Sequence, residues 1–416
     1  MKVLHVVKTS EGAPWAARQA RMLRQLGAEV HVALPVPTGT AVSAWVDAGA
    51  EIHIADLSLP VRAPHRIPAV LEATRRLVSQ VRPDVIHSHF VTTTCTLRLA
   101  LGRNHPIPRV YQVAGPLHLE HWPSRLFEIS LAGSADYWVG SSRCIVALYQ
   151  RARIPKDRLF LSYYGWFDDS EEPPRRDGAL RTLVGASTED LLIGNLNYMY
   201  PPKYALGQTV GLKCHEDVID ALGAVIRKQP TVLGVFVGGA WGDSVWYEER
   251  LRRRARHRAG DRIRFAGAFP YPVARRLWAD FDLGIHVPLS ENCGGVPEPL
   301  FAGVPVIASN VGGLPEVVME ARTGYLTPPR HPRLLARTIL EVLSDMPGAR
   351  RLAERGRRLV KVMFDARRTS TEISEIYEFV LHRRSRPPPP FDGAAFVDHL
   401  TIPESPFLPG HMQLPA

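Results

Sequence analysis

The sequence contains few cysteines, and their spacing is not that of a metal or redox site. Among 416 residues there are 4 cysteines, and no pair has the Cys-x-x-Cys spacing. This pattern indicates neither a disulfide framework nor a cysteine-based zinc site, so we expect a reducing compartment. The cysteines are Cys95, Cys144, Cys214 and Cys293.

Long apolar runs are also missing. The chain opens with MKVLHVVK, whose apolar run is too short for the hydrophobic part of a secretory signal peptide. No stretch approaches the roughly 20 apolar residues of a membrane-spanning helix. We therefore expect a cytoplasmic protein.

Acidic residues are outnumbered by basic ones. Lys and Arg total 51 against 41 Asp and Glu, a formal net charge of +10. This excess favours contact with phosphates or an anionic surface, although a solvated Arg-rich exterior explains much of it. Because the basic residues are spread over many helices without a recognised binding motif, we expect no nucleic-acid partner.

An anionic membrane remains as a partner for the positive charge. Two expected helices of the first half carry arginines with the spacing of one helix face, and such residues favour a peripheral visit to the inner face of the membrane. A solvated basic face is the alternative. The arginines are Arg18, Arg21, Arg24, Arg75 and Arg76.

Short β-type runs alternate with helical segments along most of the chain, which is typical of a parallel, helix-covered sheet. A charged, proline-containing break at 168–178 interrupts the alternation, which then restarts. The sequence therefore predicts two doubly wound α/β domains that face a central cleft. The expected strands are 2–7, 29–34, 51–55, 84–89, 109–115, 136–142, 159–165, 191–199, 232–239, 263–267, 283–289 and 304–309.

Candidate binding residues follow several of these strands, and ligands of open parallel sheets bind at that edge. Gly12 follows the first strand and precedes a helix, where a glycine lets backbone N–H groups approach a phosphate. Lys213 precedes the helix of residues 215–229, so that its ammonium would reach a diphosphate. The alternatives are that Gly12 only permits an ordinary turn and that Lys213 is an exposed loop lysine.

The stretch SENCGGVPEPLFAGVPV, residues 290–306, follows the strand 283–289. Glu298 falls in the first turn of a helix. Either the carboxylate is there because the helix dipole favours it, or it accepts hydrogen bonds from a ribose. Glu291 and the N–H groups of Gly294 and Gly295 would then face a neighbouring polyhydroxyl group and a phosphate.

Histidines also follow strands of the first half. His118 lies after the strand 109–115, close to Glu120. His87 and His89 share one face of the strand 84–89, and a metal site there is discounted because the sequence offers no third ligand within reach.

Taken in order, these motifs resemble glycosyltransferase family 4, which are retaining enzymes of the GT-B fold. The resemblance runs from about residue 2 to 382 and is strongest in the block from Glu291 through GVPVIASNVGGLPEVV to TGYLTP. PDVIHSH, DYWVGSS and LKCHEDVIDAL occupy the expected places. The resemblance implies an N-terminal acceptor-side domain (1–167), a linker (168–180), a donor domain (181–364) and a helix crossing back (365–384). Proline density and the lack of a period predict an extended or disordered tail for residues 385–416.

The resemblance also implies roles for individual residues. Glu298 would bind the nucleotide ribose, Glu291 the donor sugar, Gly12 the diphosphate, and Lys213 the leaving phosphate, with His118 near the transferred sugar. Two departures stand out: only six residues separate the two glutamates where the family has seven, and Asn195 stands where the family has a phosphate-binding arginine. Lys203, in an insertion, is the candidate replacement; weaker phosphate binding is the alternative.

The implied function is transfer of a sugar, with retention, from a nucleotide-sugar to a hydroxyl of a saccharide or lipid-linked acceptor, as in polysaccharide or glycoconjugate biosynthesis. His87, His89 and Glu120 are the acceptor-side candidates. No metal or other cofactor is required by such a mechanism. A nucleotide-sugar epimerase on the same fold and a catalytically degenerate nucleotide-sugar-binding protein are the alternatives.

Overall fold

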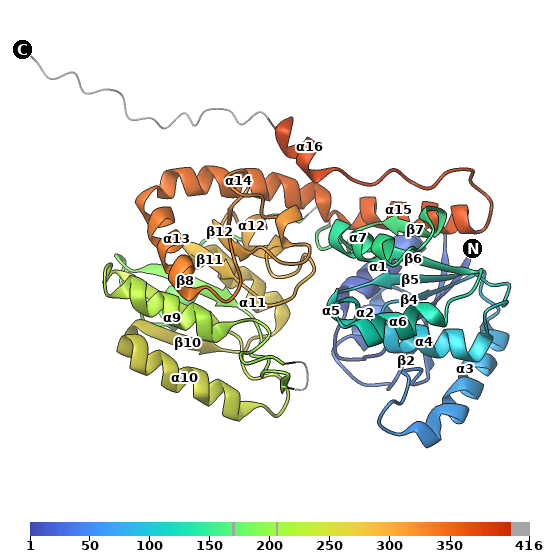
Figure 1. Cartoon of the computed structure of the whole chain (residues 1–416). Coiled ribbons are helices and arrows are strands. Elements are labelled where there is room, and N and C mark those ends of the chain that lie inside the picture. The colour runs from blue at the N-terminus through green and yellow to red at the C-terminus, as the bar shows by residue number, and fades with distance from the viewer. Residues whose placement is uncertain (169–170, 205–206, 401–416) are drawn as a thin grey trace, which may run out of the picture.

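The computed structural model describes residues 1–168, 171–204 and 207–400. They form two α/β domains side by side, each with one sheet between helices (Figure 1). The first sheet has seven strands in the order β3-β2-β1-β4-β5-β6-β7, and the second has six in the order β10-β9-β8-β11-β12-β13. Each neighbouring pair runs parallel. The predicted two-domain parallel architecture is confirmed.

The first domain contains strands β1 (Lys2–Val6), β2 (Glu29–Leu34), β3 (Glu51–Ile54), β4 (Val85–Ser88), β5 (Arg109–Val113), β6 (Asp136–Gly140) and β7 (Leu159–Leu161). Its helices are α1 (Pro14–Gln25), α2 (Val42–Asp47), α3 (Ile67–Val81), α4 (Val91–Leu101), α5 (Leu117–Glu120), α6 (Trp122–Ser130) and α7 (Arg143–Arg151). Strands such as β5 are buried along their whole length, because helices cover both faces of the sheet.

The second domain contains strands β8 (Leu191–Leu196), β9 (Val232–Val237), β10 (Ile263–Gly267), β11 (Leu283–His286), β12 (Val306–Ser309) and β13 (Tyr325–Thr327). Its helices are α8 (Ala179–Leu183), α9 (His215–Ile226), α10 (Val245–Ala259), α11 (Tyr271–Leu277), α12 (Pro297–Phe301), α13 (Pro332–Ser344) and α14 (Met346–Met363). A short 3₁₀ turn, η6 (Leu314–Glu316), follows β12.

Helix α15 (Ala366–Val380) returns from the second domain and packs on the first (Figure 1). Its apolar face, which includes Ile373, Ile376 and Tyr377, is buried in the core of the first domain with α1. The Asp365 side chain accepts a hydrogen bond from the N–H of Arg368 and caps the helix. The chain therefore passes from the first domain to the second before β8 and returns to the first with α15.

The linker is held against the second domain. Glu171 pairs with Arg275, and Arg176 Nη1 lies 2.9 Å from Asp282 Oδ1. Just before it, the N–H of Phe167 donates to the carbonyl of Phe364 over 3.2 Å, which joins the two crossing segments.

The predicted disordered tail is wrong for residues 385–400. That segment lies along the molecule and ends in helix α16 (Gly393–Asp398), where Val397 is fully buried. Arg143 Nη2 donates to the carbonyl of Phe391 over 2.8 Å, and Arg322 pairs with Asp398. The apolar side chains of α16 offset the entropy of ordering by packing against α14. The rest of the predicted tail, residues 401–416, lies outside the described residues.

Candidate active site

A pocket of about 260 Å³ lies at the carboxyl edge of the second sheet, with Trp166 of the first half on its wall. It combines apolar walls with a few polar groups, as small-molecule sites do. Strands β8, β9 and β10 end at it, and α12 begins there. The lining residues are Trp166, Leu196, Asn197, Tyr198, Tyr200, Lys213, Val237, Gly238, Ala268, Phe269, Tyr271, Ala274, Gly295 and Glu298.

Lys213 and Glu291 meet beside the pocket. The Lys213 ammonium donates to Glu291 Oε2, and His286 Nε2 lies 3.4 Å from the same oxygen. Burial alone would raise the pKa of Glu291, but the Lys213 charge and the His286 contact together lower it to about 2. Glu291 is therefore a carboxylate at any working pH, and it accepts hydrogen bonds only.

His286, at the end of β11, was not singled out from the sequence. Asn197 Nδ2 lies 3.3 Å from His286 Nδ1, and an amide N–H donated there leaves the imidazole proton on Nε2, facing Glu291. Gly295, at φ 77°, makes room for the ring: a Cβ there would lie 2.3 Å from His286 Cε1. This glycine is thus required by the close approach of the histidine as well as by its backbone angle.

The loop that carries Glu291 packs against the turn after β12. The N–H of Gly313 donates to the carbonyl of Glu291 over 3.4 Å, and a Cβ on Gly312 would lie 1.7 Å from that oxygen. The N–H of Asn292 donates to Glu291 Oε1 over 3.1 Å, so the loop backbone also orients the carboxylate. Gly294, beside it, is half-buried.

Glu298 occupies the first turn of α12, as predicted, and lines the pocket. The Tyr271 hydroxyl donates to Glu298 Oε1 over 2.7 Å. Burial raises the pKa of Glu298, and the bond from Tyr271 and the charge of Arg275 offset this only in part. Arg18 of α1 adds a weaker attraction from the first domain, and its guanidinium donates to the carbonyl of Gly165 over 3.2 Å.

Gly12 and Lys203 lie apart from this cluster among the described residues. Gly12 is half-buried in the loop between β1 and α1, and a Cβ there would meet only the Thr9 methyl group, at 3.9 Å. The left-handed backbone angle falls on the next residue, Ala13, at φ 63°. Lys203 is exposed and is not among the residues that line the pocket. Their roles at a diphosphate stay predictions.

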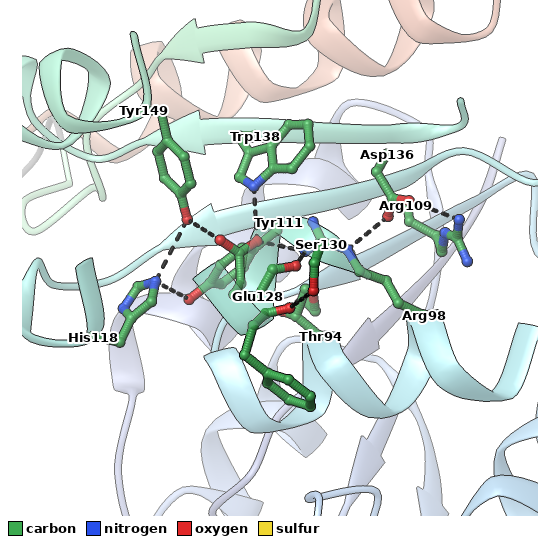
Figure 2. A network of polar contacts seen from close by, with 12 residues as sticks. Thr94, Arg98, Arg109, Tyr111, His118, Glu128, Ser130, Asp136, Trp138 and Tyr149 are labelled. Carbon is green, nitrogen blue, oxygen red and sulfur yellow. Dashed lines mark hydrogen bonds and ion pairs between the residues drawn. The ribbon is translucent and has the colours of Figure 1, made fainter. Parts of the chain in front are cut away.

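His118, in α5, sits at one end of a buried polar network (Figure 2). Its Nε2 lies 3.4 Å from the hydroxyl of Tyr111 and 3.5 Å from that of Tyr149. Tyr149 in turn donates to Glu128 Oε2 over 3.1 Å. Burial lowers the pKa of His118, so the ring is neutral at ordinary pH and available for a hydrogen bond.

The network continues into ion pairs between α4, α6 and the first sheet (Figure 2). Arg98 Nη1 pairs with Glu128 Oε1 at 2.5 Å and its Nε with Asp136 Oδ1 at 3.0 Å, all with fully buried side chains. Arg109 pairs with Asp136 over 2.7 Å, and Trp138 Nε1 donates to Glu128 over 2.9 Å. These ion pairs hold α4, α6 and the first sheet together, and Glu128 connects them to His118 through the Tyr149 hydroxyl.

His87 and His89 do not face the cleft, so the prediction that they contact an acceptor is wrong. Both are fully buried, and the ring of His5 on β1 stacks beside them. His5 Nδ1 lies 3.0 Å from His89 Nε2, and the Nδ1 atoms of His87 and His89 contact the hydroxyls of Tyr377 and Tyr164. His5 is the third imidazole that the sequence did not reveal, because it comes from a different strand. The absence of a metal stays a prediction.

Glu316, within the quoted GGLPEVV motif, joins the two domains. Its carboxylate accepts from the N–H groups of Arg143 and Cys144 at 2.9 and 3.0 Å, and from the Tyr163 hydroxyl at 2.6 Å. A carboxylate at the start of α7 is favoured by the helix dipole. Glu120, at the end of α5, is exposed, and its role on the acceptor side stays a prediction.

Asn292 adds a second link between the domains. Its Nδ2 lies 2.9 Å from the Ser141 hydroxyl, at the end of β6. The loop that carries Glu291 and Asn292 therefore touches the carboxyl edge of the first sheet, and the carboxyl edges of the two sheets face each other.

Two family models match this chain. The one described as "Glycosyl transferase 4-like domain" matches residues 12–165, and "Glycosyl transferases group 1" matches residues 204–359. Glycogen synthase of Mycobacterium tuberculosis is 29% identical over 317 residues, which cover 74% of this chain and 72% of the relative. The D-inositol 3-phosphate glycosyltransferase of Streptomyces scabiei is 29% identical over 201 residues, covering 46% and 42%.

Solved structures share the fold. Anabaena HepE in complex with UDP has a TM-score of 0.75 at 19% identity, over 90% of this chain and 99% of that one. A Listeria monocytogenes protein described as a UDP-N-acetylglucosamine 2-epimerase has a TM-score of 0.61 at 16% identity, over 93% and 98%. The likeness supports two facing domains of the GT-B type.

Proposed function

Because this chain belongs to the GT-B glycosyltransferases, with a 4-like domain followed by a group 1 domain, we propose that it is a retaining enzyme that uses a nucleotide-sugar donor. The acceptor is a hydroxyl of a saccharide or of a lipid-linked saccharide, as in polysaccharide or glycoconjugate biosynthesis. The observation that carries the proposal is the Lys213–Glu291 pair beside a pocket that Glu298 lines.

Each residue has a chemical task in this proposal. Glu298 accepts hydrogen bonds from the ribose hydroxyls. The Lys213 ammonium has three N–H donors and uses one on Glu291, so two are left for diphosphate oxygens. Glu291, ionised and oriented, accepts from hydroxyls of the donor sugar. The protein thus positions the donor and stabilises the leaving charge, and we propose that departure and attack take place on one face of the sugar.

A uridine nucleotide is the donor that we favour, because HepE structures contain UDP and UDP-glucose. The test is incubation of the protein with a panel of nucleotide-sugars, with and without saccharide acceptors. A bound donor at 100 times its dissociation constant raises stability by about 2.7 kcal/mol, which a thermal shift detects. Release of UDP with a new glycosidic bond supports the proposal. Conversion of a nucleotide-sugar without any acceptor would indicate an epimerase. Binding of a nucleotide-sugar without turnover would indicate a catalytically degenerate protein.

Glu298→Ala is expected to weaken UDP binding by roughly 10- to 100-fold, since hydrogen bonds to a charged group contribute about 1.5–3 kcal/mol. Burial raises the pKa of Glu298, so protonation should weaken UDP binding at a higher pH than for an ordinary glutamate. Glu298→Gln should remove that pH dependence. Calorimetric titration measures both effects, with exposed Glu249→Ala as the control. A Glu298→Ala protein with unchanged UDP affinity would contradict the assignment.

The three α1 arginines expected to face a membrane have other partners. Arg18 donates to Gly165, Arg21 pairs with Asp168 at 2.5 Å, and Arg24 donates to Gly49. Across residues 1–168, 171–204 and 207–400, no helix combines the length and apolarity needed to cross a bilayer.

We propose that peripheral membrane contact takes place through α6 instead. Its outer face exposes Trp122 by 66%, Leu126 by 59% and Phe127 by 46%. Trp and long apolar side chains on one helix face suit the interfacial region of a bilayer. Arg75 and Arg76 of α3 share a single carboxylate partner, Glu72, so this exposed group keeps a net positive charge in the same domain.

Flotation with lipid vesicles is expected to show binding to anionic vesicles, weaker binding at high salt, and little binding to neutral ones. The double variant Trp122→Ala/Leu126→Ala should lose most of this binding, whereas Val61→Ala, which changes an exposed side chain elsewhere, should keep it. Equal binding by the double variant and the unmodified protein would exclude α6 as the contact.

A further inference from the structure

The segment after β8 extends the second sheet beyond its regular strands. The N–H of Met199 donates to the carbonyl of Gly239 over 2.9 Å, and the N–H of Trp241 donates to the carbonyl of Met199 over 3.3 Å. Met199 is fully buried. Since side chains alternate along extended backbone, Tyr198 and Tyr200 point to the opposite face from Met199.

Three aromatic rings meet on that face. The centroid of Trp241 lies 5.3 Å from that of Tyr198, edge to face, and 4.9 Å from that of Tyr200. These are separations at which aromatic pairs attract. We call Tyr198, Trp241 and Tyr200 the aromatic wall.

The aromatic wall is continuous with the pocket and reaches beyond it. Tyr198 and Tyr200 line the pocket together with Lys213, whereas Trp241 is not a lining residue. Trp241 is 52% exposed and Tyr198 is 48% exposed. Large apolar surfaces that remain in water next to a binding pocket mark ligand-binding surfaces. Backbone hydrogen bonds fix the main chain of this segment and the three rings contact one another, so less ordering entropy is lost when a ligand binds.

We propose that the aromatic wall is a saccharide subsite that stacks a sugar ring of the acceptor beside the donor pocket. A pyranose ring carries C–H groups on its faces and hydroxyls at its rim, so it covers an aromatic face while its hydroxyls stay in water. The proposal rests on the proposed function and deepens it: the acceptor is recognised as a glycan, whether free or attached to a lipid. Val237 and Phe269 line the pocket without belonging to the aromatic wall, and they are the apolar surface left for a nucleobase.

The test measures glycan and nucleotide binding separately on the full chain. The probes are an array of α- and β-linked gluco-, manno- and galacto-oligosaccharides of two to six units, free and lipid-tailed, and UDP by calorimetry. Trp241→Ala is expected to weaken binding to the recognised glycan about 10-fold, the scale of one aromatic contact, and to leave UDP affinity within a factor of about two. Trp241→Phe should restore glycan binding. Trp246→Ala, which changes an exposed tryptophan that contacts Tyr247 instead, is the matched control.

Four outcomes overturn the subsite. The first is equal glycan binding by Trp241→Ala and the unmodified protein, and the second is a loss of UDP affinity in Trp241→Ala as large as its loss of glycan binding. The third is an unmodified protein that binds UDP but none of the glycans. The fourth is an unmodified protein that binds lipid-tailed probes but no free glycan. The second would make the aromatic wall part of the nucleotide site. Glycan binding that needs Trp241 in a protein that binds no nucleotide-sugar supports the subsite and contradicts the proposed function instead.

Discussion

Replacing Lys213 by alanine is expected to lower the turnover number of glycosyl transfer by about 100- to 1,000-fold, the typical effect of removing one donor from a developing charge. Charge on the leaving diphosphate grows toward the transition state, so the ammonium is worth more there than in the ground state. Donor affinity should therefore fall much less than turnover. Steady-state kinetics and calorimetry on the same variant give the two numbers.

The Lys213 variant also changes Glu291, which complicates its interpretation. Without the ammonium, burial is opposed by the His286 contact and by the N–H of Asn292, so the pKa of Glu291 should rise from about 2 toward its ordinary value. Comparing the double variant Lys213→Ala/Glu291→Gln with Glu291→Gln alone separates the two effects, because neither protein has a Glu291 charge to change. If lost charge on the phosphate is the cause, Lys213→Ala should slow the Glu291→Gln enzyme as much as it slows the unmodified one. Lys228→Ala, at an exposed position, is the control. A Lys213→Ala enzyme whose loss lies wholly in donor affinity would contradict the assigned role.

The sequence predicted the architecture well because parallel sheets have a simple pattern. Buried strands such as β5 and β9 are short apolar runs between helices, and their order along the chain sufficed to indicate two domains. Strand β13 was missed, since its three residues, Tyr325–Thr327, are too few to show a period. The ordered segment before α16 was missed because its partner surface is distant in sequence.

The residues around the pocket of the second domain were predicted in part. The position of Glu298 could be predicted because its loop and helix directly follow a strand. The alternation of strands and helices places such a loop at the carboxyl edge of the sheet. His286 and Tyr271 were not predicted, because they reach the two glutamates from separate elements. The requirement for Gly295 is likewise visible only once the His286 ring is placed beneath it.

The first-domain polar residues were the hardest to interpret. Arginines on helices normally face water, and periodicity does not distinguish Arg98, which is fully buried, from Arg76, which is exposed. The difference is created by pairing with Glu128 and Asp136, which lie 30 and 38 residues away in sequence. Composition carries no information about such long-range pairing.

Replacing Arg98 by methionine is expected to lower the free energy of unfolding by about 3–5 kcal/mol, the usual cost of removing one partner from a buried ion pair. Methionine keeps much of the side-chain volume, so the loss reports the charge rather than a cavity. Glu128 would lose its ion-pair partner, and Asp136 would keep only Arg109. Urea unfolding followed by circular dichroism measures the change.

The matched control and the pH dependence make the Arg98 prediction specific. Arg76→Met removes an arginine whose side chain is 69% exposed, and its effect should stay within about 0.5 kcal/mol. Lowering the pH neutralises the one carboxylate left without a cation, so the deficit of Arg98→Met relative to the unmodified protein should shrink as the solution becomes acidic. A deficit below about 1 kcal/mol at neutral pH would mean that the carboxylates find other partners. A deficit that does not change with pH would mean that lost packing, rather than unpaired charge, destabilises the fold that positions His118.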